Sequence, residues 1–163
     1  NTDYMGINQA EEGLMQREEA RQRSIEIVQA AGFDLEQMPY VSLGSKGGWN
    51  GWEVRVSQIP GDEQRTPGVM LDLANDGAVR YMEYLGEPTE AAIGAAISEQ
   101  RAQEIALAFM TQYVDAEGEA ACTAQAEDSH WKVTFEGQAD QQPCEVWIDN
   151  QTGAVLLVET FTR

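Results

Sequence analysis

The chain has 163 residues, of which 42% are hydrophobic and 23% are charged, a balance typical of a globular protein rather than a disordered one. Its formal net charge is -18, with 28 acidic residues against 10 basic ones. A surface this negative repels phosphate backbones and anionic lipid headgroups, so nucleic acids and membrane surfaces are excluded as expected partners.

Two similar stretches follow one another along the chain. We predict an N-terminal domain over residues 1–86 with a leading helical segment, a linker over 87–96, and a C-terminal domain over 97–163. No window of about 18 apolar residues exists, so we expect no membrane insertion by this segment.

The first half is predicted to form one helix and four strands. Apolar residues recur at helical spacing from about Met15 to Ala31, and Gly32 is a natural helix stop. Alternating apolar residues predict strands near 40–43, 52–56, 69–73 and 78–85. The turn Asn75-Asp76-Gly77 is typical of a hairpin.

The second half repeats this order. Ser98 can cap a helix that ends near residues 115–118. Strands are predicted over 119–126, 130–136, 144–148 and 154–161, with a turn at 149–153 before the last of them.

The predicted fold class is therefore α+β, with two repeats that each pack one helix on a four-stranded antiparallel sheet. Strand alternation places six apolar residues on the side away from the helices: Met70, Met82, Tyr84, Trp147, Leu156 and Val158. This side is either covered by the other repeat or exposed as a docking surface. We favour the internal interface, because each lobe alone has a small core.

No catalytic or metal site is indicated. His130 is the only histidine and no Cys-x-x-Cys pair is present, so neither a catalytic triad nor a zinc site is expected. The segment 72–77 resembles a calcium loop only superficially, because Ala74 stands where a ligand is needed. We predict no catalytic residue, no metal ligand and no cofactor, and take His130 as a surface or loop residue.

Cys122 and Cys144 are the only cysteines. A disulfide between them would close a loop of 23 residues and contribute about 3 kcal/mol. On the first and third strands of a meander, however, they would be about 9.5 Å apart, whereas a bridge needs Cα atoms within about 7 Å. The alternative is two unpaired core cysteines.

The four tryptophans divide into two pairs. Trp52 and Trp131 occupy matching inward positions and are expected in the core. Trp49, beside glycines, and Trp147, on the outer face, are the candidate binding residues.

The second half, from Ile97 to Arg163, resembles a PepSY domain. The likeness rests on Ile97-Ser98 before a helix with Ala102 and Ala106, on Trp131-Lys132-Val133 as the central strand, and on Val146-Trp147-Ile148-Asp149 followed by Thr152-Gly153-Ala154-Val155-Leu156. The first half, roughly Met15 to Leu85, is similar but degenerate, with one extra residue between Asp72 and Gly77.

The resemblance implies a bacterial protein of the extracellular space or cell envelope, whose signal or lipid anchor has been removed, with no catalysis of its own. Asp149 and Gly153 would shape a turn. PepSY domains occur in propeptides of thermolysin-type metalloproteases and in membrane-anchored regulators, where they bind or restrain proteases. The expected function is a non-enzymatic protein- or peptide-binding module, with an extracellular protease as a candidate partner. The alternatives are a ligand- or cation-sensing domain of a larger envelope protein or lipoprotein, and a small hydrolase that uses surface carboxylates.

Overall fold

The computed structural model describes residues 15–45, 51–59, 68–86, 97–114, 122–135 and 144–160. Its elements are α1 (Arg17–Ala30), β1 (Tyr40–Ser45), β2 (Gly51–Ser57), β3 (Gly68–Ala74), β4 (Val79–Tyr84), α2 (Glu99–Phe109), a π-helical turn η1 (Met110–Val114), β5 (Cys122–Ala126), β6 (His130–Phe135), β7 (Cys144–Asp149) and β8 (Val155–Glu159). These positions agree with the predicted helices and strands to within a few residues. The predicted linker and the leading segment before residue 15 lie outside the described residues.

All eight strands belong to one antiparallel sheet, in the order β1-β2-β3-β4-β8-β7-β6-β5. The predicted α+β fold of two repeats, each with its own four-stranded sheet, is therefore wrong. Strands β4 and β8 pair directly, with Tyr81 opposite Glu159 and Met82 opposite Val158. Two separate sheets would leave the backbone N–H and C=O groups of both strands at an edge, and the pairing satisfies these groups within one sheet.

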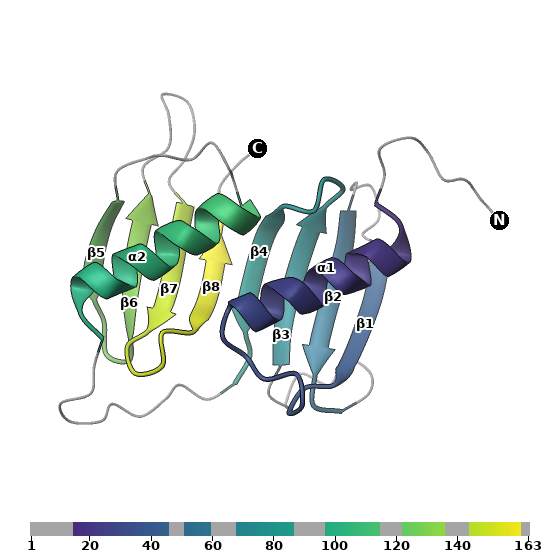
Figure 1. Ribbon diagram of the computed structural model, residues 1–163, viewed down its shortest axis with the longest axis horizontal. Coiled ribbons are helices and arrows are strands. Elements are labelled where there is room, and N and C mark those ends of the chain that lie inside the picture. Colours follow the sequence, from purple (N-terminus) through teal and green to yellow (C-terminus); the bar gives the residue numbers. More distant parts are fainter. Residues whose placement is uncertain are drawn as a thin grey trace.

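Both helices lie on the same face of the sheet and cross its strands (Figure 1). Helix α1 contacts β1, β2 and β3, while α2 contacts β5, β6 and β7. We call the opposite face, on which the described residues form no helix or strand, the open face.

Helix α1 has capping contacts at both ends. At its start the backbone N–H of Gln16 donates to the side chain of Glu19 at 2.9 Å, which satisfies a backbone donor ahead of the first turn. At its end Gly32 has a φ of 103°, and the N–H of Phe33 donates to the carbonyl of Val28 at 3.2 Å. Glycine reaches this left-handed conformation without strain, which is why the helix stops here as predicted.

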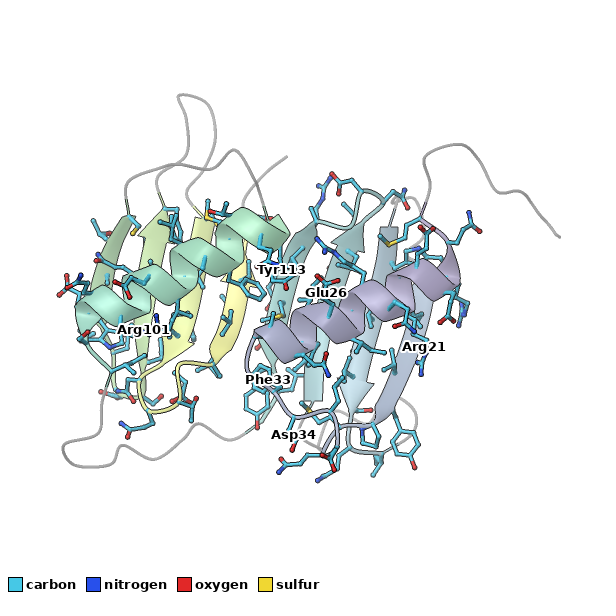
Figure 2. All side chains as sticks on the ribbon, viewed as in Figure 1. Arg21, Glu26, Phe33, Asp34, Arg101 and Tyr113 are labelled. Carbon is cyan, nitrogen blue, oxygen red and sulfur yellow. The ribbon has the colours of Figure 1, made fainter. Side chains whose placement is uncertain are left out.

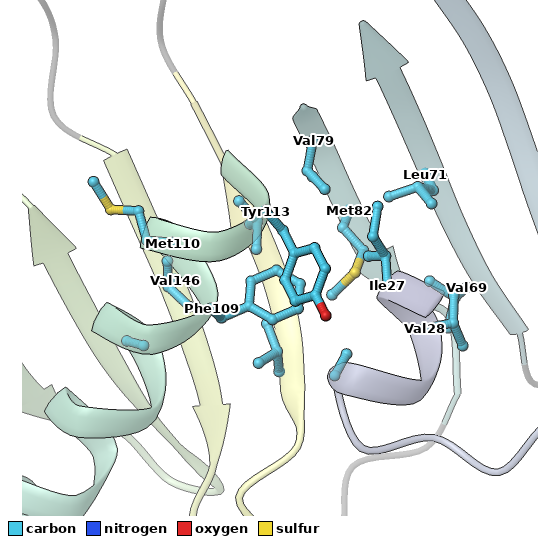
Figure 3. Close-up of a cluster of buried hydrophobic side chains, with 14 of the residues drawn as sticks. Ile27, Val28, Val69, Leu71, Val79, Met82, Phe109, Met110, Tyr113 and Val146 are labelled. Atoms are coloured by element: carbon cyan, nitrogen blue, oxygen red, sulfur yellow. The ribbon is translucent and has the colours of Figure 1, made fainter. Parts of the chain in front are cut away.

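Helix α2 begins as predicted at Ser98, whose Oγ accepts the N–H of Arg101 at 3.1 Å. Its last turn is the wider η1, which packs against β4 of the first half. Figure 3 shows Phe109 and Tyr113 pointing from this region toward Met82 of β4 and Ile27 of α1. The two rings lie 5.0 Å apart, so the second half contributes aromatic side chains to a core shared with the first.

Polar contacts reinforce the same junction. Tyr113 and Glu26 lie where the ends of the two helices approach each other (Figure 2). The guanidinium of Arg23 sits 5.1 Å from the centre of the Tyr113 ring, and its Nε donates to the carbonyl of Gly77 at 3.0 Å. Burial raises the pKa of Tyr113, and the charge of Glu26 adds to this shift. Arg23 thus links α1 both to η1 and to the β3–β4 turn.

Two tryptophans fasten the helix starts to the sheet. The indole N–H of Trp52 in β2 donates to the carbonyl of Met15 at 3.0 Å, and that of Trp131 in β6 donates to the carbonyl of Ile97 at 3.1 Å. Each acceptor comes just before the N-terminal cap of a helix. Both rings are partly buried against the core, as predicted, and their polar N–H groups are satisfied at the same time.

Each half of the sheet contains one β-bulge. Asp72 pairs with Tyr81 and Leu73 with Val79, which leaves Arg80 as the extra residue. In the other half Trp147 pairs with Leu157 and Ile148 with Val155, so Leu156 is extra there. An inserted residue reverses the inward and outward alternation of the strand that carries it.

Because of these bulges, part of the predicted outer face is wrong. Met82 and Val158 are fully buried under the helices, and Tyr84 stacks on Phe33 with ring centres 4.8 Å apart. The predicted internal interface between two outer faces is also wrong. Because the halves join edge to edge through β4 and β8, their outer faces lie side by side on one sheet.

Candidate binding surface

Side chains on the open face follow from the strand register, because residues directly opposite on neighbouring antiparallel strands share a face. One line of such residues, which we call the mixed row, consists of Arg55, Met70, Glu83, Leu157, Trp147 and Lys132. The next line, which we call the carboxylate row, consists of Glu53, Asp72, Tyr81, Glu159 and Glu145. All of these side chains are partly buried, so the two rows form a continuous surface across both halves.

Trp147 is the largest side chain of the mixed row. Its ring stacks on His130 with ring centres 4.1 Å apart and planes 14° from parallel. Its indole N–H donates to Oε1 of Glu145 at 2.7 Å. Strand β7 brings these groups together because Glu145 and Trp147 are two residues apart and therefore point to the same side. The indole is thus held in one orientation with an apolar surface toward solvent.

His130 begins β6 and lies opposite Asp149. Its Nε2 atom is buried and has no hydrogen-bond partner among the described residues. Burial lowers the pKa of the imidazole, and nearby carboxylates, Glu127 first among them, offset part of this shift. A neutral ring stacked on an indole suits apolar contact, and the buried Nε2 is badly placed to take a proton from a substrate.

Tyr81 occupies the middle of the carboxylate row. Its hydroxyl donates to Oε1 of Glu83 at 2.7 Å. Burial raises its pKa well above the usual phenol value, and the hydrogen bond and charge of Glu83, then the charges of Glu159 and Asp72, raise it further. Tyr81 therefore stays protonated at neutral pH and acts as a hydrogen-bond donor within a line of carboxylates.

The predicted site residues lie in different situations. Trp147 is on the open face, while Trp49 lies outside the described residues. Tyr81 and Glu145 were not among the predicted site residues, and His130 was predicted as a surface or loop residue without its stacking partner. The i, i+2 spacing of Glu145 and Trp147 within a strand was the available signal, whereas His130 and Tyr81 required the cross-strand register.

Cys122 and Cys144 are both paired in register with Phe135, one from each side. Strand β6 therefore lies between them, and two strand spacings amount to about 9.5 Å, more than the roughly 7 Å that a disulfide allows. Burial raises the pKa of the Cys122 thiol. A bridge would require these strands to move, so the disulfide stays a prediction.

Two further properties concern the described part of the chain. No group of three or more histidine, cysteine, aspartate or glutamate side chains is arranged there to hold a metal ion. None of its helices is both long enough and apolar enough to cross a lipid bilayer.

Comparisons of this chain with protein-family models, with curated proteins and with solved structures find no match.

Proposed function

We propose that this chain is a non-enzymatic binding module that holds a protein or peptide on the open face of its sheet. The observation that carries the proposal is Trp147, which is partly exposed yet fixed by its stack on His130 and its hydrogen bond to Glu145. Aromatic side chains held in this way lose little conformational entropy on binding and are the usual anchors of protein interfaces.

The chemistry of the open face supports binding over catalysis. His130 stays neutral with its Nε2 buried. The hydroxyl of Tyr81 donates a hydrogen bond to Glu83, and burial together with this carboxylate raises the pKa of Tyr81. Neither group is poised as a general base near neutral pH. The remaining side chains of the mixed row are apolar or charged groups typical of a contact surface.

The resemblance of residues 97–163 to a PepSY domain supports two finer parts of the proposal. It favours a location in the extracellular space or cell envelope, and it favours a protease as the partner. Both parts rest on the motifs around Trp131 and Asp149, and neither follows from the geometry of the open face.

Peptide binding is tested by selecting a displayed library of random peptides on the purified chain. The recovered peptides are then labelled, and their affinities are measured by fluorescence anisotropy. We expect Trp147→Ala to weaken binding about thirtyfold, corresponding to the loss of about 2 kcal/mol at an interface anchor. The matched control is Leu107→Ala, which removes an exposed apolar side chain from α2 on the other face and should change the affinity less than about twofold.

If Trp147→Ala binds the selected peptides as tightly as the wild type does, the open face is not the binding surface. Circular dichroism and urea unfolding of each variant separate this outcome from loss of the fold. Failure to recover any binding peptide would contradict the proposal as a whole.

The protease part is tested separately with thermolysin as the probe. We expect the chain to slow thermolysin's hydrolysis of a chromogenic peptide in a dose-dependent way, and Trp147→Ala to slow it less. An unchanged rate at saturating chain concentration would remove thermolysin-type proteases from the proposal and leave peptide binding standing.

A further inference from the structure

The carboxylate row places like charges next to one another. Glu53 lies directly opposite Asp72, and Glu159 lies directly opposite Glu145. Like charges in directly opposed positions destabilise a sheet. Tyr81, the residue between these pairs, is neutral, and its hydroxyl donates a hydrogen bond to Glu83.

The two rows together carry an excess of negative charge. Glu83 adds a fifth carboxylate, and the rows contain two cations, Arg55 and Lys132, so the excess is three negative charges at neutral pH. Both cations belong to the mixed row and lie near its ends, on β2 and β6. The centre of the open face is therefore acidic along one row and largely apolar along the next.

We propose that the occupant of the open face is a basic amphipathic segment of a partner protein, an inference that rests on the proposed function. Its lysine or arginine side chains lie along the carboxylate row. Its apolar side chains contact Met70, Leu157 and Trp147 in the mixed row. The occupant is chosen by charge complementarity, because the two rows carry an excess of negative charge that attracts a cationic segment.

The spacing of the carboxylates suits a helix that crosses the strands, as α1 and α2 do on the other face. Neighbouring strands lie about 4.8 Å apart, so the row from β2 to β7 spans roughly 19 Å. A helix rises about 1.5 Å per residue and repeats one face every three to four residues, so its cations recur every 4.5 to 6 Å, roughly. About 13 residues therefore cover the row.

The net charge of the whole chain also favours a cationic partner. A net charge of -18 accelerates the approach of a cationic partner and repels an anionic one, and added salt screens both effects. Binding of a basic segment should therefore weaken as ionic strength rises.

The test uses three labelled helical peptides of about 15 residues that share the same leucines and differ only at the polar positions, which are all lysine, all glutamine or all glutamate. We expect the wild-type chain to bind the lysine peptide at least tenfold more tightly than the glutamine peptide, and to bind the glutamate peptide least. The preference for lysine should shrink in high salt.

Two double variants test whether the preference for the lysine peptide depends on the carboxylate row. Glu53→Gln with Glu159→Gln removes two charges from the carboxylate row and should weaken binding of the lysine peptide roughly tenfold. Glu18→Gln with Glu104→Gln removes the same charge from exposed positions on the two helices and should change binding about twofold or less.

Equal affinity for all three peptides, with binding still lost in Trp147→Ala, would overturn the basic-segment inference and leave the proposed function intact. Equal weakening by the two double variants would also overturn it, since binding would then follow net charge and not the open face. A change in tryptophan fluorescence on adding Ca²⁺ that exceeds an ionic-strength control and is absent in Trp147→Ala, with no response to the lysine peptide, would overturn the inference and assign the row to cations instead.

Discussion

His130 and Tyr81 are two titratable residues on the open face that stay neutral near pH 7. Both can titrate, yet burial stabilises the neutral form of each. For His130 this also links protonation to folding. Because the folded state lowers its pKa, the unfolded chain takes up the proton more readily.

The stabilising contribution of a neutral His130 is complete above the usual imidazole pKa of about 6.5. It is lost as the pH falls through that value toward the lower pKa of the folded state. His130→Phe retains a ring to stack on Trp147 but cannot titrate. We expect the unfolding free energy of the wild type to fall relative to that of His130→Phe between about pH 7.5 and 5.5, measured by urea unfolding. A difference that is constant across this range would contradict the buried, neutral histidine.

Gly153 illustrates a constraint on the backbone itself. Its φ is 81°, and a Cβ atom added there would lie 3.1 Å from Cδ1 of Ile105. We expect Gly153→Ala to cost about 1–2 kcal/mol of unfolding free energy, since alanine resists the left-handed conformation. Gly44→Ala is the control, because nothing lies within 4 Å of its added Cβ. Equal losses in the two variants would show that the turn does not demand glycine.

At the scale of elements, the sequence is informative wherever local chemistry decides the structure. Ser98 caps α2 and Gly32 ends α1, as predicted from residue type alone. The bulges at Arg80 and Leu156 lack such a local signal, because an extra residue is recognised only against its partner strand. Alternation placed Trp147 on the correct side because its own strand, β7, carries no extra residue.

Met82 and Val158 follow the bulged residues of their strands, which is why alternation placed them on the wrong side. They pair with each other at the centre of the sheet. This pairing joins strands that are far apart in the chain, so no local pattern reveals it. The same non-local register creates the carboxylate row, and for this reason the sequence indicated Trp147 but not its surroundings.

The hydrogen bonds from Trp52 and Trp131 to the starts of the helices, which we call the tryptophan clamps, give a separate prediction for each helix. Trp131→Phe keeps most of the ring but removes the hydrogen bond to the carbonyl of Ile97. We expect a loss of about 1 kcal/mol and faster amide hydrogen exchange in the first turn of α2, with α1 unchanged. Trp52→Phe is the matched variant and should produce the converse pattern through Met15. Exchange that rises equally in both helices would argue against local clamping.

At the scale of the whole molecule, the continuous sheet makes the two halves one structural unit. The β4–β8 pairing joins them along the sheet, and Tyr113 with Arg23 joins them across the helix layer. The open face is consequently a single surface contributed by both halves, wider than either could offer alone.

Such a molecule should unfold cooperatively. We expect urea unfolding followed by tryptophan fluorescence and by far-ultraviolet circular dichroism to give one coincident transition. The variant Met82→Ala, which truncates a fully buried side chain at the junction, should lower the unfolding free energy by about 2–5 kcal/mol while keeping a single transition. Two separated transitions in the wild type would contradict a shared core.

The claim that the open face binds a partner is tested most directly by following the indole N–H signals in a two-dimensional NMR titration with the library-selected peptides. The indole N–H of Trp147 bonds to Glu145 on the open face, whereas those of Trp52 and Trp131 bond to backbone carbonyls beside the helices. If the open face holds the peptide, the Trp147 signal shifts with saturation while the signals of Trp52 and Trp131 stay in place. Saturable binding that leaves the Trp147 signal unmoved, or that shifts the two clamp signals instead, would contradict that claim.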